Sequence, residues 1–343
     1  VGNVPIAPRK TLIAALSLAV GLFLGLVTVL VRHALRRGVE SVDQIQSGGL
    51  QVYATVPRSD KQDRLNPGLS AGLKKKHQSF FESKAGRFIL SNLEKMNIRI
   101  KRPEPVKHKR SKEGVGGVLA FKDPGDQAIE ALRSLRTSLH FAMLEANNNV
   151  LMLTGPGPGV GKSFVSLNLA AVCAQSGQKV LLIDADMRKG HLHQFFGVSS
   201  ANGLSDVLVE RVDLESAVRQ SEDKNLDFIV RGTAPPNPSE LLMSASFNRL
   251  LDTLSRHYDL VIVDTPPLLA VTDAAIVGTL AGTTLMVVRF QNSQQKEIER
   301  ADEQLRAAGV RARGAILNAV EKTATSYYGY GYGYYHYEYK SNQ

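Results

Sequence analysis

The pattern of hydrophobic and polar positions divides the chain into distinct parts. Residues 11–31 form an unbroken apolar run, whereas residues 150–317 alternate short apolar runs with stretches of helical periodicity. The segment between these parts, and the residues after them, lack a sustained hydrophobic period. We therefore expect one globular unit that is preceded by a hydrophobic helix and followed by a polar tail.

Within the globular unit, short apolar runs predict buried strands and longer amphipathic stretches predict helices. The expected strands are Val150–Thr154, Val180–Ile183, Asp227–Val230, Leu260–Val263, Thr284–Val288 and Ala315–Leu317. The expected helices are Asp126–Glu145, Lys162–Ser176, Ser239–Ser255, Thr272–Leu280 and Ser293–Ala308. Because strands that alternate with helices form crossover units, we predict an α/β fold: a parallel sheet with helices on both faces. Ligands bind such sheets at the carboxyl ends of the strands.

The apolar run from Thr11 to Val31 contains no charged side chain. A helix of this length spans about 31 Å, which matches a bilayer hydrocarbon core of about 30 Å. A signal-peptide core is shorter, and no clear small-residue cleavage site follows. We therefore predict a transmembrane helix over 11–31. More basic residues follow the run than precede it, so we expect residues 1–10 to be a periplasmic flank and the rest to be cytoplasmic.

The formal net charge of +10 arises from one segment. Between Arg58 and Lys112 the chain has 16 Lys or Arg against 5 Asp or Glu, so the remainder is close to neutral. A nucleic-acid-binding protein more often carries its basic residues on the folded domain. We interpret 32–115 as a juxtamembrane region and basic linker, either solvated or in contact with the membrane surface, and expect no nucleic-acid partner. The single cysteine, Cys173, excludes a disulfide-stapled miniprotein.

A Gly-rich segment, GPGPGVGKS at residues 155–163, follows the first strand and opens a helix. Such a turn lets backbone N–H groups surround phosphates at a helix N-terminus, with Lys162 at the β- and γ-phosphates and Ser163 on Mg²⁺. The strict pattern G-x4-G-K-[ST] fails because Pro156 replaces its first glycine, but the strand–loop–helix context supports a phosphate loop. A turn without a ligand would leave the Gly-Lys-Ser unexplained. The expected nucleotide-binding residues are Gly155, Gly157, Gly159, Val160, Gly161, Lys162, Ser163 and Phe164.

Acidic residues follow two further strands. Asp184 and Asp186 come after the second expected strand, and Asp264 comes after the fourth. Either group alone is also explained as a helix cap. Both together, in this order after a phosphate loop, favour a site at which carboxylates serve Mg²⁺ and the attacking nucleophile.

The C-terminal residues are rich in tyrosine. Eight of the ten tyrosines lie here: Tyr327, Tyr328, Tyr330, Tyr332, Tyr334, Tyr335, Tyr337 and Tyr339. Residues 326–343 have glycines between the tyrosines and no aliphatic residue, so the tail at 323–343 cannot form a core and we expect disorder. Composition alone fits either an adhesive aromatic tail or a set of phosphoryl acceptors, and the phosphate loop in the same chain favours the acceptors.

The ordered set of motifs resembles the bacterial tyrosine autokinases of the Wzc-like polysaccharide co-polymerase family. The resemblance rests on the apolar run after PIAPRK (5–10), the loop at 155–163, IDADMRKG (183–190), RGTAPPNPSELL (231–242), VDTPP (263–267) and the tyrosine tail. It implies a MinD/ParA-like P-loop NTPase fold over residues 116–322. It also implies that the chain is the C-terminal part of a longer protein, in which a periplasmic chain-length-determinant domain and a first transmembrane helix precede Val1.

The resemblance assigns roles to four catalytic residues, Lys162, Asp184, Asp186 and Asp264. Asp184 corresponds to the base or orienting group for the tyrosine hydroxyl. Asp186 and Asp264, together with Ser163, correspond to the ligands of Mg²⁺, with Asp264 as the Walker-B acid. The implied cofactors are ATP and Mg²⁺.

Two further features are assigned by the resemblance. Asn318, at the end of the last strand, is expected to contact adenine. Glu130, Arg133 and Arg136 match a helix motif through which these kinases form rings, and their spacing keeps the three side chains near one helical face. Without the resemblance, this motif indicates only an exposed charged face.

The sequence departs from the family at one regulatory position. In proteobacterial relatives a tyrosine follows the stretch that corresponds to Arg188–Gly190 and is an internal phosphorylation site, whereas this chain has His191. Arg231 occupies the position of the residue that pairs with that phosphotyrosine, so in this chain it lacks the expected phosphotyrosine partner.

The implied function is an ATP-dependent tyrosine autokinase that phosphorylates the tail between subunits of a homo-oligomeric ring. It would regulate capsular or exopolysaccharide polymerisation and export at the bacterial inner membrane, with a tyrosine phosphatase and the export machinery as partners. The alternative is a membrane-anchored MinD/ParA-like switch ATPase, but such proteins carry an additional early Lys in the loop and have no use for a tyrosine tail. A non-catalytic nucleotide-binding regulator predicts substitutions at Lys162, Ser163 or Asp264, and none is present.

Overall fold

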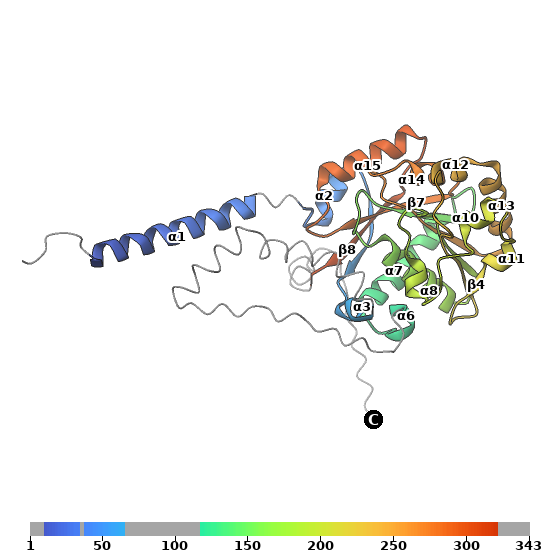
Figure 1. Ribbon diagram of the computed structural model, residues 1–343, viewed down its shortest axis with the longest axis horizontal. Helices are drawn as coiled ribbons and strands as arrows, with labels where there is room; N and C mark the ends of the chain where they lie inside the picture. Colours follow the sequence, from blue (N-terminus) through green and yellow to red (C-terminus); the bar gives the residue numbers. More distant parts are fainter. Residues whose placement is uncertain (1–9, 35–37, 66–116, 322–343) are drawn as a thin grey trace, which may run out of the picture.

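The computed structural model describes residues 10–34, 38–65 and 117–321, with the side chains of residues 16–28 in its first helix (Figure 1). The strands are β1 (Val52–Pro57), β2 (Val150–Thr154), β3 (Val180–Asp184), β4 (Arg219–Gln220), β5 (Leu226–Ile229), β6 (Leu260–Asp264), β7 (Thr283–Arg289) and β8 (Gly314–Val320). They form one sheet in the order β1-β8-β7-β2-β6-β3-β5-β4. All described neighbours are parallel except β4 and β5, so the predicted parallel sheet is confirmed.

The helices precede, connect or flank these strands. They are α1 (Lys10–Ala34), α2 (Val42–Ser47), α3 (Asp60–Leu65), α6 (Leu119–Lys122), α7 (Gln127–Met143), α8 (Lys162–Gln175), α9 (Leu192–Phe195), α10 (Leu204–Leu208), α11 (Leu214–Ala217), α12 (Pro238–Met243), α13 (Ala245–His257), α14 (Asp273–Gly278) and α15 (Gln295–Ala307).

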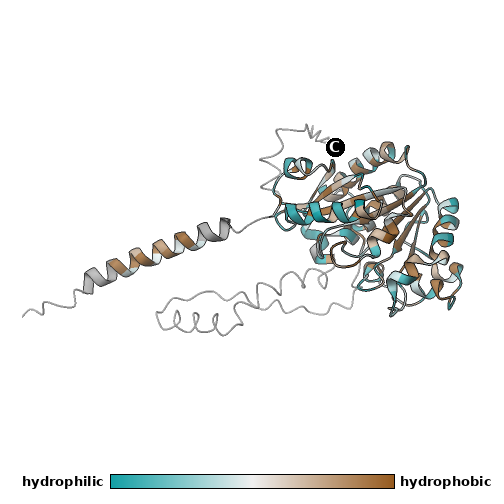
Figure 2. Cartoon of the chain, turned by 90° about the horizontal axis from the view of Figure 1, so that it is seen from above, coloured by the Kyte–Doolittle hydropathy of each residue, from teal (hydrophilic) through white to brown (hydrophobic). Residues whose placement is uncertain are grey.

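The core has two layers because successive side chains of a strand point to opposite faces of the sheet. In β2, Leu151 and Leu153 join the cluster that contains the buried sides of α7 and α8, whereas Val150 and Met152 join the cluster under α13 and α15. The two sets of helices lie on opposite sides of the sheet in Figure 1. In Figure 2 the strands are mainly hydrophobic, and hydrophilic residues gather on the outer helices. The predicted helices on both faces are therefore confirmed.

One predicted helix is divided in two. The expected helix Ser239–Ser255 is α12 followed by α13, because Ser244 adopts an extended conformation with ψ of 149°. The Oγ of Ser244 accepts a hydrogen bond from the N–H of Phe247, so this serine is the N-cap of the second helix.

The residues before the expected domain contribute a strand to the sheet. β1 pairs in parallel with β8, and Val56 is completely buried. The N–H of Val39 also donates to the carbonyl of Ser293 at 2.8 Å. Part of the predicted juxtamembrane region and basic linker over 32–115, residues 38–65, is thus joined to the sheet and its helices. Most of the basic linker, residues 66–116, lies outside the described residues.

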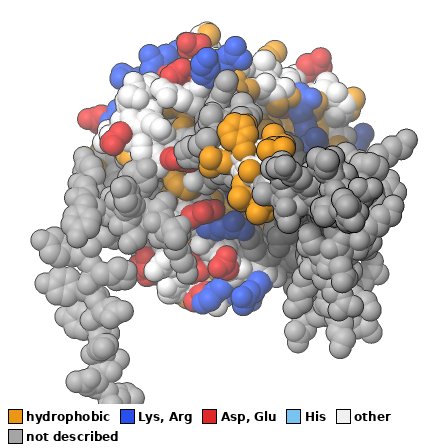
Figure 3. Space-filling model, turned by 90° about the vertical axis from the view of Figure 1, so that its left-hand side faces the viewer, with side chains coloured by type: hydrophobic (Ala, Val, Ile, Leu, Met, Phe, Trp, Pro, Cys, Tyr) orange, Lys and Arg blue, Asp and Glu red, His pale blue; other side chains and the backbone are white. Residues whose placement is uncertain are grey.

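Helix α1 covers the predicted apolar run and lies apart from the sheet in Figure 1. Its described large hydrophobic side chains, which include Leu22 and Phe23, are exposed. Figure 3 views the molecule from this side and shows hydrophobic side chains gathered near the middle, with charged residues spread around them. Across the described residues, no helix combines the length and hydropathy that a membrane crossing requires. The flank at residues 1–9 and the tyrosine tail at 323–343 lie outside the described residues.

Candidate nucleotide-binding and acidic site

The Gly-rich loop connects β2, in the middle of the sheet, with α8. Gly159 and Gly161 have φ angles of +74° and +94°, which side-chain-bearing residues rarely adopt. A Cβ at Gly155 would lie 2.6 Å from the carbonyl oxygen of Val287. The carbonyl of Gly155 accepts a hydrogen bond of 2.9 Å from the N–H of Leu268. Glycine at these positions therefore permits the tight loop that the sequence predicts.

Two side chains, one from β7 and one from β8, donate hydrogen bonds to backbone carbonyls of the loop. The Nδ2 of Asn318 donates to the carbonyl of Val160 at 2.9 Å, and Nη1 of Arg289 donates to the carbonyl of Gly159 at 3.0 Å. Asn318 is only 4% exposed. The structure therefore places Asn318 against the loop backbone, and its predicted contact with adenine stays a prediction. Arg289 was missed in the sequence because no motif marks it.

Lys162 and Ser163 begin α8, and Phe164 follows them in the same turn. Lys162 is 8% exposed, and this burial lowers the pKa of its ammonium group, although Asp264 and Asp186 act in the opposite direction. The hydroxyl of Ser163 forms a hydrogen bond with Asp264. The phosphate-loop lysine and the strand-end carboxylate that the sequence predicts are thus brought together.

Asp184 and Asp264 are register partners at the ends of β3 and β6. Asp184 is completely buried, and burial, with Asp264 as the next contribution, raises the pKa of its carboxyl. Burial also raises the pKa of Asp264, while hydrogen bonding from Ser163 and the charge of Lys162 oppose the shift. Ser166 adds a hydrogen bond of 3.0 Å from its Oγ to Oδ1 of Asp264. Two buried carboxylates therefore lie side by side beside the phosphate loop.

The segment after β3 folds tightly around these carboxylates. The Oδ2 of Asp184 accepts from the N–H of Leu192 at 3.1 Å, which ties the start of α9 to the acidic strand end. The Oδ1 of Asp186 accepts from the N–H groups of Arg188 and Lys189 at 3.2 and 2.8 Å. A Cβ at Gly190 would overlap the Asp184 carboxylate. The backbone thus fixes both acidic side chains of the motif at residues 184–190.

The residues of this site fit a magnesium nucleotide. Backbone N–H groups of a Gly-rich loop with a lysine suit phosphates, and a hydroxyl with one or two carboxylates suits Mg²⁺ that is also bound by phosphate oxygens. No cluster of three or more His, Cys, Asp and Glu side chains suited to a metal occurs in the described part of the chain. The buried carboxylates Asp184 and Asp264, whose pKa values are raised, would be stabilised in their ionised form by a bound cation.

An ion pair between the partly exposed Arg188 and the buried Asp273 supports the acidic segment. Both carboxylate oxygens of Asp273, in the first turn of α14, accept from Arg188, with 2.9 Å from Nε to Oδ2 and 3.1 Å from Nη2 to Oδ1. The Oγ of Ser239 donates to Oδ1 of Asp273 at 2.6 Å. Arg231 Nη1 donates to the carbonyl of Arg188 at 3.3 Å. The sequence suggested none of these contacts, although all four residues lie in or near its motifs.

His191 takes the place of the expected tyrosine at the edge of the site. Its ring lies 5.8 Å from that of Phe195, and its electrostatic interaction with Asp264 opposes the burial that raises the pKa of Asp264. Burial, followed by the nearby charges of Arg231 and His191, lowers the pKa of His193. The Nε of Arg231 and the Nδ1 of His193 are buried without a hydrogen-bond partner among the described residues. The Arg231 guanidinium therefore lies near the His193 imidazole, and no acidic side chain of the described part of the chain pairs with its Nε.

The predicted ring motif lies on α7, whose N-terminal part carries an internal ion pair. Arg133 pairs with Glu130, and its Nη1 also donates to the carbonyl of Pro124 at 2.9 Å. Arg136 donates to the carbonyl of Val172 in α8 at 3.3 Å. These contacts hold the three side chains within one molecule, and their role between subunits stays a prediction.

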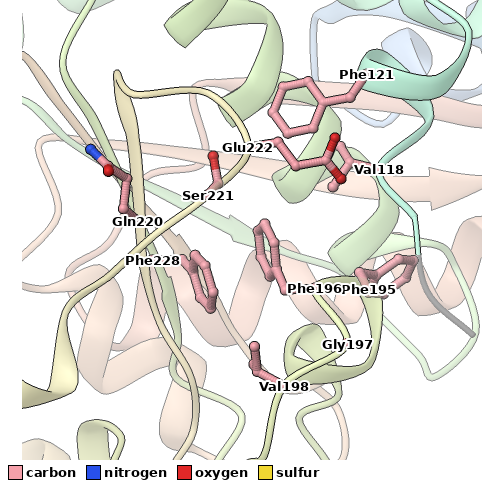
Figure 4. A pocket seen from close by; sticks show the side chains of 10 residues that line it. All are labelled: Val118, Phe121, Phe195, Phe196, Gly197, Val198, Gln220, Ser221, Glu222 and Phe228. Atoms are coloured by element: carbon pink, nitrogen blue, oxygen red, sulfur yellow. The ribbon is translucent and has the colours of Figure 1, made fainter. Parts of the chain in front are cut away.

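A separate apolar pocket lies between α6, α9 and β5 (Figure 4). Its volume is about 430 Å³. It is lined by Val118, Phe121, Phe195, Phe196, Gly197, Val198, Gln220, Ser221, Glu222 and Phe228. None of these is a predicted site residue, and no motif in the sequence marks the pocket.

Comparison with known proteins gives a consistent picture. A family model described as an AAA domain matches residues 150–296. The Etk tyrosine-protein kinase of Escherichia coli K12 is 44% identical over 327 residues, which are 94% of this chain and 40% of the relative. The Wzc tyrosine-protein kinase of Salmonella typhimurium is 43% identical over 320 residues, 93% of this chain and 40% of the relative. The chain thus spans about two fifths of the length of the curated relatives that it matches.

Solved structures agree with these relatives. The kinase domain of Escherichia coli Etk superposes with a TM-score of 0.66 at 43% identity, covering 86% of this chain and all of that domain. The BceF tyrosine kinase domain gives a TM-score of 0.64 at 41% identity, covering 82% of this chain and 99% of that domain. With its phosphate loop and paired acidic strand ends, the chain belongs to the bacterial tyrosine-protein kinase family of Etk and Wzc.

Proposed function

We propose that this chain is an ATP-dependent protein-tyrosine autokinase that phosphorylates its own C-terminal tyrosine cluster. The observation that carries the proposal is the convergence of Lys162 with the buried Asp184 and Asp264 at one end of the central strands. Phosphoryl transfer requires positioning and charge neutralisation, and this arrangement supplies cationic and anionic groups for both. The eight tail tyrosines provide acceptors in the same chain.

Each residue of the site has a distinct role in the proposed phosphoryl transfer. Loop N–H groups and Lys162 would hold the β- and γ-phosphates, and Ser163, Asp186 and Asp264 would hold Mg²⁺, which when bound would supply positive charge to the transferred group. Asp184 accepts the proton of the tyrosine hydroxyl. Its raised pKa suits that task, because a base with a pKa closer to neutrality is a better proton acceptor.

The biological setting is also a proposal. Residues 11–31 cross the inner membrane, residues 1–10 are periplasmic and the kinase domain is cytoplasmic. Subunits form a ring through Glu130, Arg133 and Arg136, and each tail reaches a neighbouring site. The cycle regulates capsular or exopolysaccharide polymerisation and export, with the export machinery and a tyrosine phosphatase as partners. The relatives named as tyrosine-protein kinases support this setting, as does a putative one from the cps region of Klebsiella pneumoniae, which is 42% identical.

Each tail phosphate adds a charge of about −1.5 to −2 at neutral pH. Heavily phosphorylated tails repel the carboxylates of the site and one another, which loosens the ring. Removal of the phosphates restores assembly, so the proposal predicts a cycle rather than a permanent state.

The experiment is autophosphorylation of the full chain, in detergent, with ATP and Mg²⁺, mapped by mass spectrometry. The proposal predicts phosphate on tail tyrosines that disappears in Lys162→Met and in a variant with all eight tail tyrosines changed to Phe. Lys296→Met, at an exposed position of α15, is the matched control and is expected to behave like the wild type. ATP hydrolysis without phosphotyrosine would instead support a membrane-anchored switch ATPase.

A further inference from the structure

The pocket between α6, α9 and β5 is built from aromatic rings. Phe196 and Phe228 stack with their centroids 3.8 Å apart and their planes 5° from parallel. Phe121 and Phe195 complete an aromatic lining, and Glu222 stands at the rim, where it pairs with Lys122 at 3.2 Å. Figure 4 shows Phe196 and Phe228 face to face, with the Glu222 carboxylate directed toward the side of the pocket where Val118 lies. The pocket therefore offers flat apolar surfaces with a few polar groups at the edge.

The pocket adjoins the acidic site through α9. The first residue of this helix, Leu192, donates its N–H to the Asp184 carboxylate at 3.1 Å. Phe195 lies three residues later, which is about 4.5 Å along the helix axis. The backbone of the pocket wall and the proposed catalytic base are therefore separated by about one helical turn.

We propose that this pocket anchors an unphosphorylated tyrosine ring of the C-terminal tail, residues 327–339, while another tyrosine of the same tail is presented to Asp184. The inference rests on the proposed autokinase function, which it extends with a substrate-docking site. Aromatic rings prefer stacked or edge-to-face contacts with other rings, and the phenol hydroxyl finds polar partners at a rim of Gln220, Ser221 and Glu222.

The spacing of the tail fits this arrangement. Tyrosines recur every one or two residues from Tyr327 to Tyr339. An extended chain advances about 3.3 Å per residue, so a tyrosine three or four positions from the anchored ring lies about 10–13 Å away. That distance is of the same order as one helical turn plus the length of a tyrosine side chain. The recurrence of the ring thus serves both docking and phosphorylation.

The tail is also long enough to reach the pocket from its own strand. The tail follows Glu321, just after β8, and four strands lie between β8 and β5 in the sheet. Five strand spacings of about 4.8 Å amount to about 24 Å. The 13 residues from 322 to 334 extend to about 43 Å at most, which exceeds this separation. The tail of a neighbouring copy has the same length and the same tyrosines for docking in this pocket.

Phosphorylation is expected to release the anchored ring. A phosphate dianion among phenylalanine rings would lose its hydration, which is costly. The Lys122 ammonium at the rim is already paired with Glu222. The pocket therefore selects tails that are not yet phosphorylated, and phosphorylation of the docked ring ends its own docking.

The test measures binding without ATP, so that it does not depend on catalysis. A labelled peptide of residues 323–343 is titrated, by fluorescence anisotropy, against the full chain in detergent whose own eight tail tyrosines are changed to Ser. Phe196→Ser and, separately, Phe121→Ala are expected to weaken binding at least tenfold, as loss of a central aromatic contact does. The matched control is Phe141→Ser, at a 66% exposed ring on α7, which should leave the affinity unchanged.

Two further outcomes decide the proposal. The fully phosphorylated peptide is expected to bind at least tenfold more weakly, and in kinase assays Phe196→Ser should raise KM for the peptide with kcat unchanged. Equal peptide affinity of Phe196→Ser and the parent chain would overturn the docking site, even if the kinase is active.

If the chain binds the tail peptide but has no kinase activity, the docking pocket is supported and the proposed autokinase function is rejected. Displacement of the tail peptide by a peptide of residues 78–92 would assign the pocket to the basic linker and overturn the proposal.

Discussion

Arg188 and Asp273 form a two-point ion pair that joins the acidic segment after β3 to the first turn of α14. The carboxylate of Asp273 is fully buried, whereas Arg188 keeps 38% of its side chain exposed. Because the N–H of Arg188 also donates to Asp186, the pair fixes the segment that holds the proposed metal ligand. The loop thus depends on a contact between residues 85 positions apart in the sequence.

Replacing Asp273 by Asn is expected to destabilise the fold and to raise the Mg²⁺ concentration needed for activity. Loss of one partner of a buried pair costs about 3–5 kcal/mol, and exposure of Arg188 reduces this to about 2 kcal/mol. Urea unfolding and a Mg²⁺ titration of autophosphorylation measure the two effects. The control is Asp252→Asn, which breaks the exposed pair with Arg256 and should cost under about 0.5 kcal/mol. Equal effects of the two variants would contradict this role of the buried pair.

A Cβ at position 161 is expected to damage the phosphate loop. Gly161→Ala combines a φ of +94° with an overlap with the Asn318 amide. Left-handed strain alone costs about 1–2 kcal/mol, and displacement of Asn318 removes the support of Val160. We expect nucleotide affinity, measured by calorimetry, to fall at least tenfold.

The matched control is Gly177→Ala, because Gly177 has a φ of +95° and a Cβ at this position would meet no described atom within 4 Å. This variant should lose only the stability that left-handed strain costs, and its nucleotide affinity should be unchanged. If both variants bind nucleotide equally well, the Asn318 contact does not support the loop.

The buried Asp184 makes the stability of the nucleotide-free protein depend on pH. Its folded pKa is raised, so the protonated carboxyl stabilises the fold fully below the unfolded value of about 3.9, and this contribution is lost as pH rises through the folded pKa. Asp184→Asn removes the ionisation. Its free energy of unfolding relative to the wild type should therefore increase between pH 5 and pH 8, without Mg²⁺ or ATP. Asp252→Asn serves as the exposed control, and parallel pH profiles for wild type and Asp184→Asn would argue against a raised pKa.

The single cysteine is expected to be unreactive in the folded chain. Burial raises the pKa of the Cys173 thiol to about 12, although the charge of Arg136 opposes the shift. Since the thiolate is the nucleophile, alkylation by iodoacetamide at pH 8 should be slower than in urea by at least a hundredfold. Mass spectrometry of the time course checks this. Rapid labelling of the native chain would show that α8 opens at this position.

The ring motif makes a prediction about assembly. Arg133→Ala combined with Arg136→Ala should reduce the sedimentation coefficient of the full chain in detergent, because both guanidinium groups lie on the helix proposed to contact the next subunit. Arg133 also pairs with Glu130 internally, so unfolding must be measured in parallel. A folded double variant that sediments like the wild type would reject the ring contact. Arg256→Ala, on α13, is the matched control.

Much of the fold is encoded in local patterns. Each predicted strand from Val150 onward is present, because apolar runs of three to five residues between polar turns have few other ways to be buried. The phosphate loop and Asp184, Asp186 and Asp264 were found for a related reason. Their chemistry requires particular residue types directly after a strand, so the sequence marks both the element and its function.

Other features depend on contacts between distant residues. β1 was missed because only Val56 among its side chains is buried, and its pairing with β8 is decided about 260 residues later. Ser244 divides a helix whose amphipathic pattern continues through it, since its side chain caps the next turn. Local periodicity contains no information about either event.

The sequence by itself determined the α/β architecture, the phosphate loop, the order of the acidic motifs and the tyrosine cluster, because these depend on neighbours in the chain. Only the tertiary structure placed Asn318 beneath the loop, paired Arg188 with Asp273 and stacked Phe196 on Phe228. Each of these contacts joins two elements that are separate in sequence. Their partners are selected by how strands and helices pack in space, and that packing is a property of the whole chain rather than of any segment.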